Sequence, residues 1–238
     1  MLVNFITFKW GTKYGPEYVN RLFRTLTNTY SGKFIFHCIT DDDKDLDTGI
    51  ITTNIKDIIP STKVFTMQKM YALNRMFFIK GNNCIIDLDV LIQNDLYQYF
   101  KTYNFEEPRF IEPIWQNKEH VYRTYHQASC MVNSSLLTWK DDQLDYLYQF
   151  YINNKKIIEN KYNSFDRFLF YNFYDKLKFH PKKIVYAYSF GALHPNDLEI
   201  EKYRPEYDIA IFLTSHGTGT ELHDANPWAI DMWKRYDN

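Results

Sequence analysis

The sequence predicts an α/β fold with a mostly parallel sheet and helices on both of its faces. Short β-rich runs alternate with amphipathic helical stretches through the first hundred residues, and this alternation is typical of parallel sheets. Polar and acidic residues follow several predicted strands, at the edge where such sheets bind their ligands. The chain has 238 residues, enough for one domain with a sizeable core.

The first half of the chain gives the clearest elements. Pro16 opens a helix, because proline is well tolerated at the first helical position, and Gly81 ends another. Val19, Leu22, Phe23 and Leu26 recur at helical spacing and predict the apolar face of the first helix. We expect strands at 3–8, 33–40, 49–55 and 85–92, and helices from Pro16 onward and at 63–80.

The second half has a more mixed pattern, which predicts a smaller, mixed portion of the fold. Leu144, Leu147, Tyr148 and Tyr151 mark an amphipathic helix. We expect further strands at 109–114, 127–133, 184–190 and 208–215, and further helices at 164–177 and 228–236.

Composition excludes some classes of partner. The formal net charge is −1 and no Lys/Arg tract is present, so nothing favours a nucleic-acid partner. No apolar run reaches membrane-spanning length, and the N-terminus lacks the pattern of a signal peptide. Cys38, Cys84 and Cys130 are far apart and show no zinc spacing, which predicts reduced, buried thiols. We therefore expect a soluble, cytoplasmic protein without a transmembrane segment.

The segment Ile85–Ile92 places two acids inside a run that otherwise looks like a buried strand. Alternation along a strand would put Asp87 and Asp89 on the same side. Two neighbouring carboxylates in an apolar setting repel each other unless a cation lies between them, and a hard divalent cation with nucleotide phosphates meets that need. The alternative is a strand end that emerges into water, with both acids solvated.

These features together resemble GT-A fold glycosyltransferases, particularly the glycogenin- and galactosyltransferase-like group. Asp87-Leu88-Asp89 matches the family's Asp-x-Asp motif. The other segments that resemble family elements are Phe5–Tyr14, Phe34–Asp42, Ser129–Ser134, Ile211–Gly217 and Asn226–Trp228. The resemblance implies one GT-A domain over residues 1–238, with a Rossmann-like nucleotide-binding half at about 1–100 and a sugar- and acceptor-binding half at about 101–238.

The resemblance also implies a metal site. Asp87 and Asp89 would bind Mn²⁺ or Mg²⁺, and His216 would be the third protein ligand. An imidazole in the shell would favour manganese. His223 is the rival ligand from the same polar loop, and His216 could instead be an ordinary loop histidine.

The nucleotide would lie against the end of the first strand. Tyr14 is the candidate to stack on uracil, the backbone of Thr7 and Phe8 could contact the base edge, and Trp10 is a further candidate. Trp10 and Tyr14 could equally be core residues. The remaining candidates are Asp41 or Asp42 for the base or ribose, Lys69 for the diphosphate, and Leu88 between the two motif acids. Lys69 could instead be a solvated lysine, and Asp41 and Asp42 could be solvated loop residues.

Asp166 resembles the aspartate of the family's Asp-Gln element, which holds hydroxyls of the donor sugar, although Arg167 replaces the glutamine. Asp166 could also be a helix-start acid favoured by the helix dipole. Gln127 and Ser129 would line the sugar pocket.

The resemblance predicts a metal-dependent glycosyltransferase. It would move a hexose from a UDP-sugar donor to a glycan, lipid or protein hydroxyl. The resemblance favours retention; inversion, which would need a carboxylate base near the acceptor hydroxyl, is the alternative. The alternatives are a metal-dependent nucleotidyltransferase, a non-catalytic carbohydrate- or nucleotide-binding module, and a phosphatase.

Overall fold

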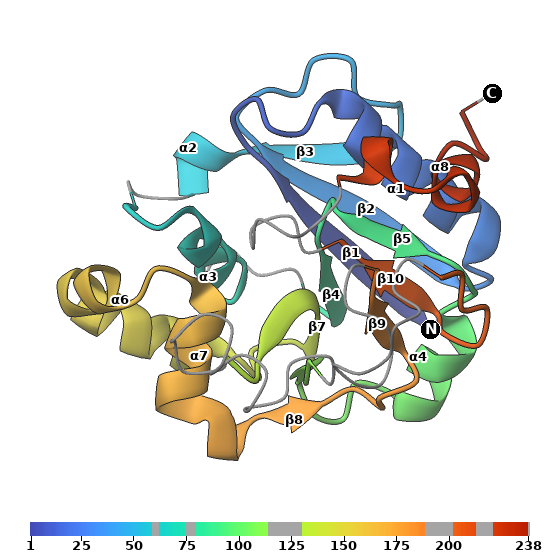
Figure 1. Ribbon diagram of the computed structural model, residues 1–238. Coiled ribbons are helices and arrows are strands. Elements are labelled where there is room, and N and C mark those ends of the chain that lie inside the picture. The colour runs from blue at the N-terminus through green and yellow to red at the C-terminus, as the bar shows by residue number, and fades with distance from the viewer. Residues whose placement is uncertain (59–61, 75–79, 114–129, 189–201, 213–220, 238) are drawn as a thin grey trace.

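A seven-stranded sheet forms the centre of the molecule in the computed structural model (Figure 1). The structure describes residues 1–58, 62–74, 80–113, 130–188, 202–212 and 221–237. The strands of this sheet are β1 (Leu2–Lys9), β2 (Lys33–Thr40), β3 (Ile50–Asn54), β4 (Asn82–Ile86), β6 (Arg109–Ile111), β7 (Asn133–Lys140) and β8 (Lys178–Phe179). Their order is β3-β2-β1-β4-β7-β6-β8.

The sheet is mostly parallel, as the sequence predicts. Strands β3, β2, β1 and β4 are parallel neighbours, β7 runs antiparallel to both β4 and β6, and β8 is parallel to β6. Strand β1 is buried from Val3 to Lys9, as expected of a central strand covered on both faces. The predicted mostly parallel α/β architecture is therefore confirmed.

The alternation of β1 sends its side chains into two cores, one on each face of the sheet. Val3 and Phe5 enter the core that contains α1 (Pro16–Thr29), α4 (Tyr97–Tyr103) and α8 (Pro227–Trp233). Ile6 and Phe8 enter the core that contains α3 (Lys69–Ala72), α6 (Asp145–Lys161) and α7 (Phe165–Phe173). The remaining short elements are α2 (Ile55–Ile58) and the 3₁₀ turns η1 (Phe65–Gln68), η2 (Tyr174–Lys176) and η4 (Leu222–Asp224).

A second, three-stranded sheet lies beside the first and was not expected from the sequence (Figure 1). It consists of β5 (Val90–Ile92), β10 (Ile209–Ile211) and β9 (Val185–Ala187). Strand β10 is central, antiparallel to β5 and parallel to β9. All nine residues of these strands are buried, and they belong to the same core as Val3 and Phe5.

Three sequence predictions need correction. The single strand expected at 85–92 is in fact two strands in different sheets, because the chain turns at 87–89. The last contact with the large sheet before the turn is the hydrogen bond that the Asp87 amide donates to the Ser135 carbonyl. Both strands are fully buried, so hydrophobic periodicity could not reveal the break. The strand at 127–133 is wrong for residues 130–132, since β7 begins only at Asn133; residues 127–129 lie outside the described part of the chain.

The long helix expected at 63–80 is replaced, over residues 65–72, by η1 followed by the single turn α3. The turn closes with i→i−3 hydrogen bonds from Leu73 to Met70 and from Asn74 to Tyr71. Tertiary contacts fix this path: Thr66 Oγ1 accepts a hydrogen bond from the Phe165 amide at 3.0 Å, and Lys69 is directed into the interior. Such contacts override a local helical pattern.

None of the helices in the described residues is long and apolar enough to cross a membrane. The thiols of Cys38, Cys84 and Cys130 are free; the first two are buried and Cys130 is half-buried. Burial raises the pKa of the Cys38 thiol to about 12, which keeps it protonated and unreactive.

Candidate active site

The Asp-x-Asp segment forms the turn that joins the two sheets. It lies at the carboxyl end of β4, where α/β sheets bind ligands. Leu88 is 4% exposed and anchors the middle of the turn in the core, while Asp87 and Asp89 are only half-buried. The turn thus presents two carboxylates on either side of a buried leucine.

Lys69 neutralises the first of these acids. Its side chain is buried, and Nζ lies 2.7 and 2.8 Å from the two carboxylate oxygens of Asp87. Nζ also donates to the carbonyl oxygen and the Oγ of Ser134, each at 3.1 Å. A buried ammonium needs partners of this kind because desolvation is costly. The interpretation of Lys69 as a solvated lysine is therefore wrong, because its ammonium lies in the interior against Asp87 and Ser134.

Tyr14 reaches the second acid. Its hydroxyl donates to Asp89 Oδ2 at 3.1 Å, and its ring packs on Tyr18 with centroids 4.8 Å apart. Burial, and then the negative charge of Asp87, raises the pKa of Asp89 well above its ordinary value; Lys69, Lys13 and the Tyr14 hydrogen bond act in the opposite direction. Two carboxylates in this state are stabilised by an added cation.

Asp166 approaches the same group from helix α7. Ser164 caps that helix by accepting the Arg167 amide at 3.2 Å, which places Asp166 in the first turn. Burial raises the pKa of Asp166, and the charge of Lys69 and hydrogen bonding to Ser134 oppose that rise. Its Oδ1 atom is buried without a hydrogen-bond partner in the described part of the structure. A buried carboxylate oxygen of this kind is suited to accept a ligand hydroxyl.

The loop after β1 is held by contacts within the protein. Thr7 and Phe8 are buried in β1. The Gly11 amide donates to Asp41 Oδ2 at 2.9 Å, so this acid supports the loop. Trp10 stacks on Phe65 with centroids 6.4 Å apart, and Lys9 Nζ donates to the Asp42 carbonyl at 3.2 Å.

The residues at the turn fit a divalent cation in charge and chemistry, because carboxylate oxygens suit Mg²⁺ and Mn²⁺. The described residues contain no group of three or more His, Cys, Asp or Glu side chains that could hold a metal, so no third side chain of these four types joins Asp87 and Asp89 there. His223 does not join Asp87 and Asp89. Its Nδ1 lies 2.8 Å from Tyr18 Oη, and its Nε2 lies 3.3 Å from Asp224 Oδ2. His216, Gln127 and Ser129 lie outside the described residues.

The sequence did not predict the roles of Ser134 and Tyr18. Ser134 belongs to a segment that resembles the family, but its contact with Lys69 depends on tertiary structure. Tyr18 connects the Tyr14 ring to His223, and its position on the buried face of α1 was the only available signal.

No family model and no curated protein matches this chain by sequence. Solved structures do match. The galactosyltransferase LgtC, in complex with donor and acceptor sugar analogues, has a TM-score of 0.58 at 9% identity, over 99% of this chain and 96% of its own. The chain has the GT-A fold of the glycosyltransferases.

Two further GT-A structures agree with this assignment. Mouse xyloside xylosyltransferase 1 has a TM-score of 0.54 at 8% identity, over 79% of this chain and 87% of its own. The bifunctional glycosyltransferase WbbM has a TM-score of 0.61 at 8% identity, over 99% of this chain and 52% of its own. At such low identity the likeness establishes the GT-A fold alone, so the activity has to be argued from the site.

Proposed function

We propose that this protein is a glycosyltransferase that moves a hexose from a UDP-sugar to a hydroxyl acceptor, with retention. The observation that carries the proposal is the convergence of Asp87, Asp89, Lys69 and Asp166 at the carboxyl edge of a GT-A sheet. These residues come from the β4–β5 turn, α3 and α7, which lie far apart in the sequence.

In this proposal, Asp87 and Asp89 hold Mn²⁺ or Mg²⁺ together with His216. The bound ion would stabilise the charge that develops on the departing diphosphate. Lys69 holds Asp87 in position through its contacts with the two carboxylate oxygens and Ser134. Tyr14 orients Asp89 through its hydroxyl, and its ring remains the candidate to stack on the base.

Asp166 has the role of a positioning group for the donor sugar. Its unpartnered Oδ1 can accept a sugar hydroxyl, while the neighbouring Lys69 favours the ionised carboxylate. The resemblance to the glycogenin-like group favours retention. Gln127 is the proposed second residue on the sugar side.

The proposal is tested by thermal shift and by product analysis on one set of proteins. UDP should raise the melting temperature of the wild-type protein when Mn²⁺ is present and not after chelation, since ligand binding stabilises the folded state by mass action. Asp87→Asn and Asp89→Asn should lose this shift and abolish turnover of UDP-hexoses. Asp224→Asn, an exposed acid of η4, is the matched control.

The products separate the rival functions. A glycosyltransferase releases UDP, whereas a nucleotidyltransferase releases pyrophosphate. Wild-type turnover in Asp89→Asn, or an equal UDP shift with and without the metal, would reject the proposed site. Sugar binding that is insensitive to both chelation and Asp89→Asn would support a non-catalytic module instead.

A further inference from the structure

A row of exposed apolar side chains follows helices α6 and α7. Tyr146, Phe150, Ile157 and Tyr171 are 44%, 41%, 68% and 52% exposed, and we call these four residues the α6–α7 patch. They are half of the eight large hydrophobic residues that are exposed in the described chain. Such a concentration on two helices marks an interaction surface, because isolated exposed residues are ordinary but contiguous ones are not.

Buried rings connect the members of the patch. Tyr146 and Phe150 both contact Phe173, with centroids 5.8 and 5.2 Å apart. Tyr171 stacks on Tyr162 at 5.9 Å, and both Tyr162 and Phe150 contact Phe168. Tyr146, Phe150 and Tyr171 therefore rest on one set of packed rings, and Ile157 lies about two helical turns beyond Phe150 on α6.

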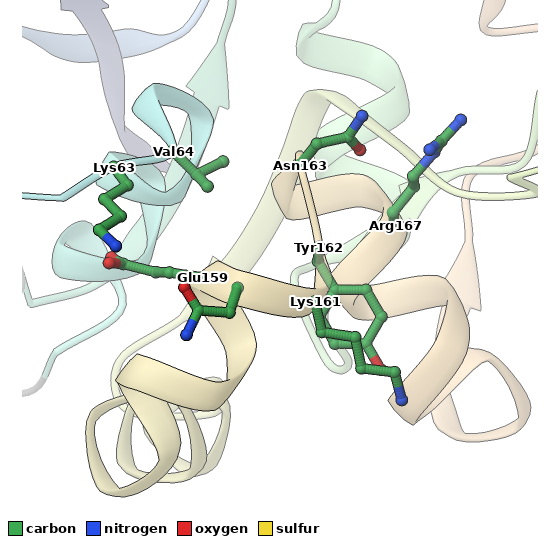
Figure 2. A pocket seen from close by; sticks show the side chains of 8 residues that line it. Lys63, Val64, Glu159, Lys161, Tyr162, Asn163 and Arg167 are labelled. Carbon is green, nitrogen blue, oxygen red and sulfur yellow. The ribbon is translucent and has the colours of Figure 1, made fainter.

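A polar hollow of about 320 Å³ adjoins the patch at Tyr162, between the start of η1 and the connection from α6 to α7 (Figure 2). Lys63 and Val64 line one side of it, and Tyr162 and Arg167 line the other. Lys161 also lines it and lies over the Tyr162 ring at 5.0 Å. Cationic side chains thus border the aromatic surface.

The exposed charges of helices α6 and α7 themselves are mainly positive, while the exposed acids Asp142 and Asp175 lie just beyond the helix ends. Helices α6 and α7 carry the cations Lys155, Lys156, Lys161 and Arg167, and the acids Asp145, Glu159 and Asp166. The Glu159 side chain is only 8% exposed, and its Oε1 accepts hydrogen bonds from Thr62 and Tyr151 at 2.6 Å. Asp166 interacts with Lys69 at the candidate active site. Two of the three acids are therefore engaged inside the molecule.

The cations do not converge on one point. In Figure 2 the Lys161 and Arg167 side chains extend in different directions from the two sides of Tyr162. Spread charges of this kind suit an extended anionic surface better than a single bound anion. Protein–protein interfaces are depleted in lysine, whereas tyrosine and lysine both favour the boundary between lipid and water.

We propose that the α6–α7 patch docks this protein on an anionic lipid surface. Ile157 and the exposed rings enter the boundary between headgroups and acyl chains, and the lysines contact the headgroup phosphates. Helix α7 carries Asp166 in its first turn and Tyr171 near its end, so the docked face and the candidate active site share this helix. The inference goes beyond the proposed activity and does not depend on it.

The experiment is flotation with phosphatidylcholine vesicles, either alone or with about one third phosphatidylserine, in the absence of sugar nucleotide. Wild-type protein should float with the anionic vesicles, and raising NaCl from about 0.05 M to about 0.5 M should release much of it. The double variant Ile157→Ser, Tyr171→Ser should bind at least about tenfold more weakly. Lys161→Glu should lose about tenfold on anionic vesicles and little on neutral ones.

Ile51→Ser on β3 and Lys33→Glu on β2 are matched controls, because both positions are exposed and outside the patch. They should bind like the wild type. No flotation of the wild type, or equal losses in patch and control variants, overturns the inference. Self-association that the double variant abolishes overturns it in favour of a second copy of the chain. The UDP thermal shift is measured separately, so failure of one proposal does not imply failure of the other.

Discussion

At the scale of single residues, the two motif acids differ in their partners. Asp87 is held at both oxygens by a buried lysine, whereas Asp89 receives one hydrogen bond from Tyr14 and lies next to the charge of Asp87. Asp89 is therefore the less compensated of the two. Removal of the Tyr14 hydroxyl should therefore change the environment of Asp89 without disturbing the fold.

Tyr14→Phe tests this difference. Removing the hydroxyl that donates to Asp89 should cost about 1 kcal/mol, so metal-dependent UDP affinity should fall about fivefold. Affinity is measured by titration calorimetry with Mn²⁺ present. Tyr18→Phe is the control, because its hydroxyl lies against His223 instead of the motif; an equal loss in both variants would contradict the role given to Tyr14.

Single residues also show how far the sequence could lead. Asp87 and Asp89 could be predicted because two acids inside an apolar run are chemically unusual. The pairing of Lys69 with Asp87 could not, since it joins residues on separate elements and depends on the tight path of η1 and α3. The contact of Tyr14 with Asp89 likewise depends on how the loop after β1 folds back over the sheet.

At the scale of elements, helix α7 positions a site residue at its first turn and packs Phe168, Leu169 and Phe173 into the core. Its start is fixed by the Ser164 cap and by the hydrogen bond between the Phe165 amide and Thr66. The orientation of Asp166 therefore depends on how firmly the first turn is held.

Ser164→Ala should lower the free energy of unfolding by about 1 kcal/mol, the usual cost of losing a side-chain cap. Urea denaturation measures this loss. Ser164→Asp retains an acceptor for the Arg167 amide and should keep most of the stability. If Ser164→Ala and Ser164→Asp are equally destabilised, the cap is not what holds the start of this helix.

Prediction of elements succeeded where local sequence signals mark the element. Strand β2 has the predicted bounds, Lys33–Thr40, and α1 begins at Pro16 as expected. It failed where tertiary pairing decides the structure. Strand β8 has two residues and α4 has seven, and neither was predicted.

At the scale of the whole molecule, the fold class could be predicted and the second sheet could not. Its three strands have three residues each and come from the middle and the end of the chain. Only their mutual pairing makes them a sheet, and short buried strands leave little periodicity in the sequence. The same core that holds them also holds Val3 and Phe5 of the main sheet.

The buried His180 and the half-buried His37 should make the whole molecule sensitive to acid. Burial, together with Arg109, lowers the pKa of His180 to about 3, and burial lowers the pKa of His37 to about 4. Between these values and the ordinary value of about 6.5, the unfolded chain binds protons that the folded protein does not. Stability should therefore fall as the pH drops below about 6.5.

For His180 alone this loss amounts to about 2 kcal/mol at pH 5 relative to pH 7.5. Urea denaturation at the two pH values measures it. His180→Gln should remove that part of the pH dependence, although it also changes the contact with Tyr99 at 2.7 Å. An unchanged difference between the two pH values in the variant would assign the acid sensitivity to other groups.

The connection between β4 and β5 has a mechanical consequence. Asp87 is fastened to the large sheet through its amide and the Ser135 carbonyl, while the carbonyl of Asp89 accepts the Phe212 amide at the end of β10. The backbone of each acid is therefore hydrogen-bonded to a different sheet. Any shear between the two sheets changes the spacing of the two carboxylates, so remote repacking of the small sheet can alter the geometry of the candidate site.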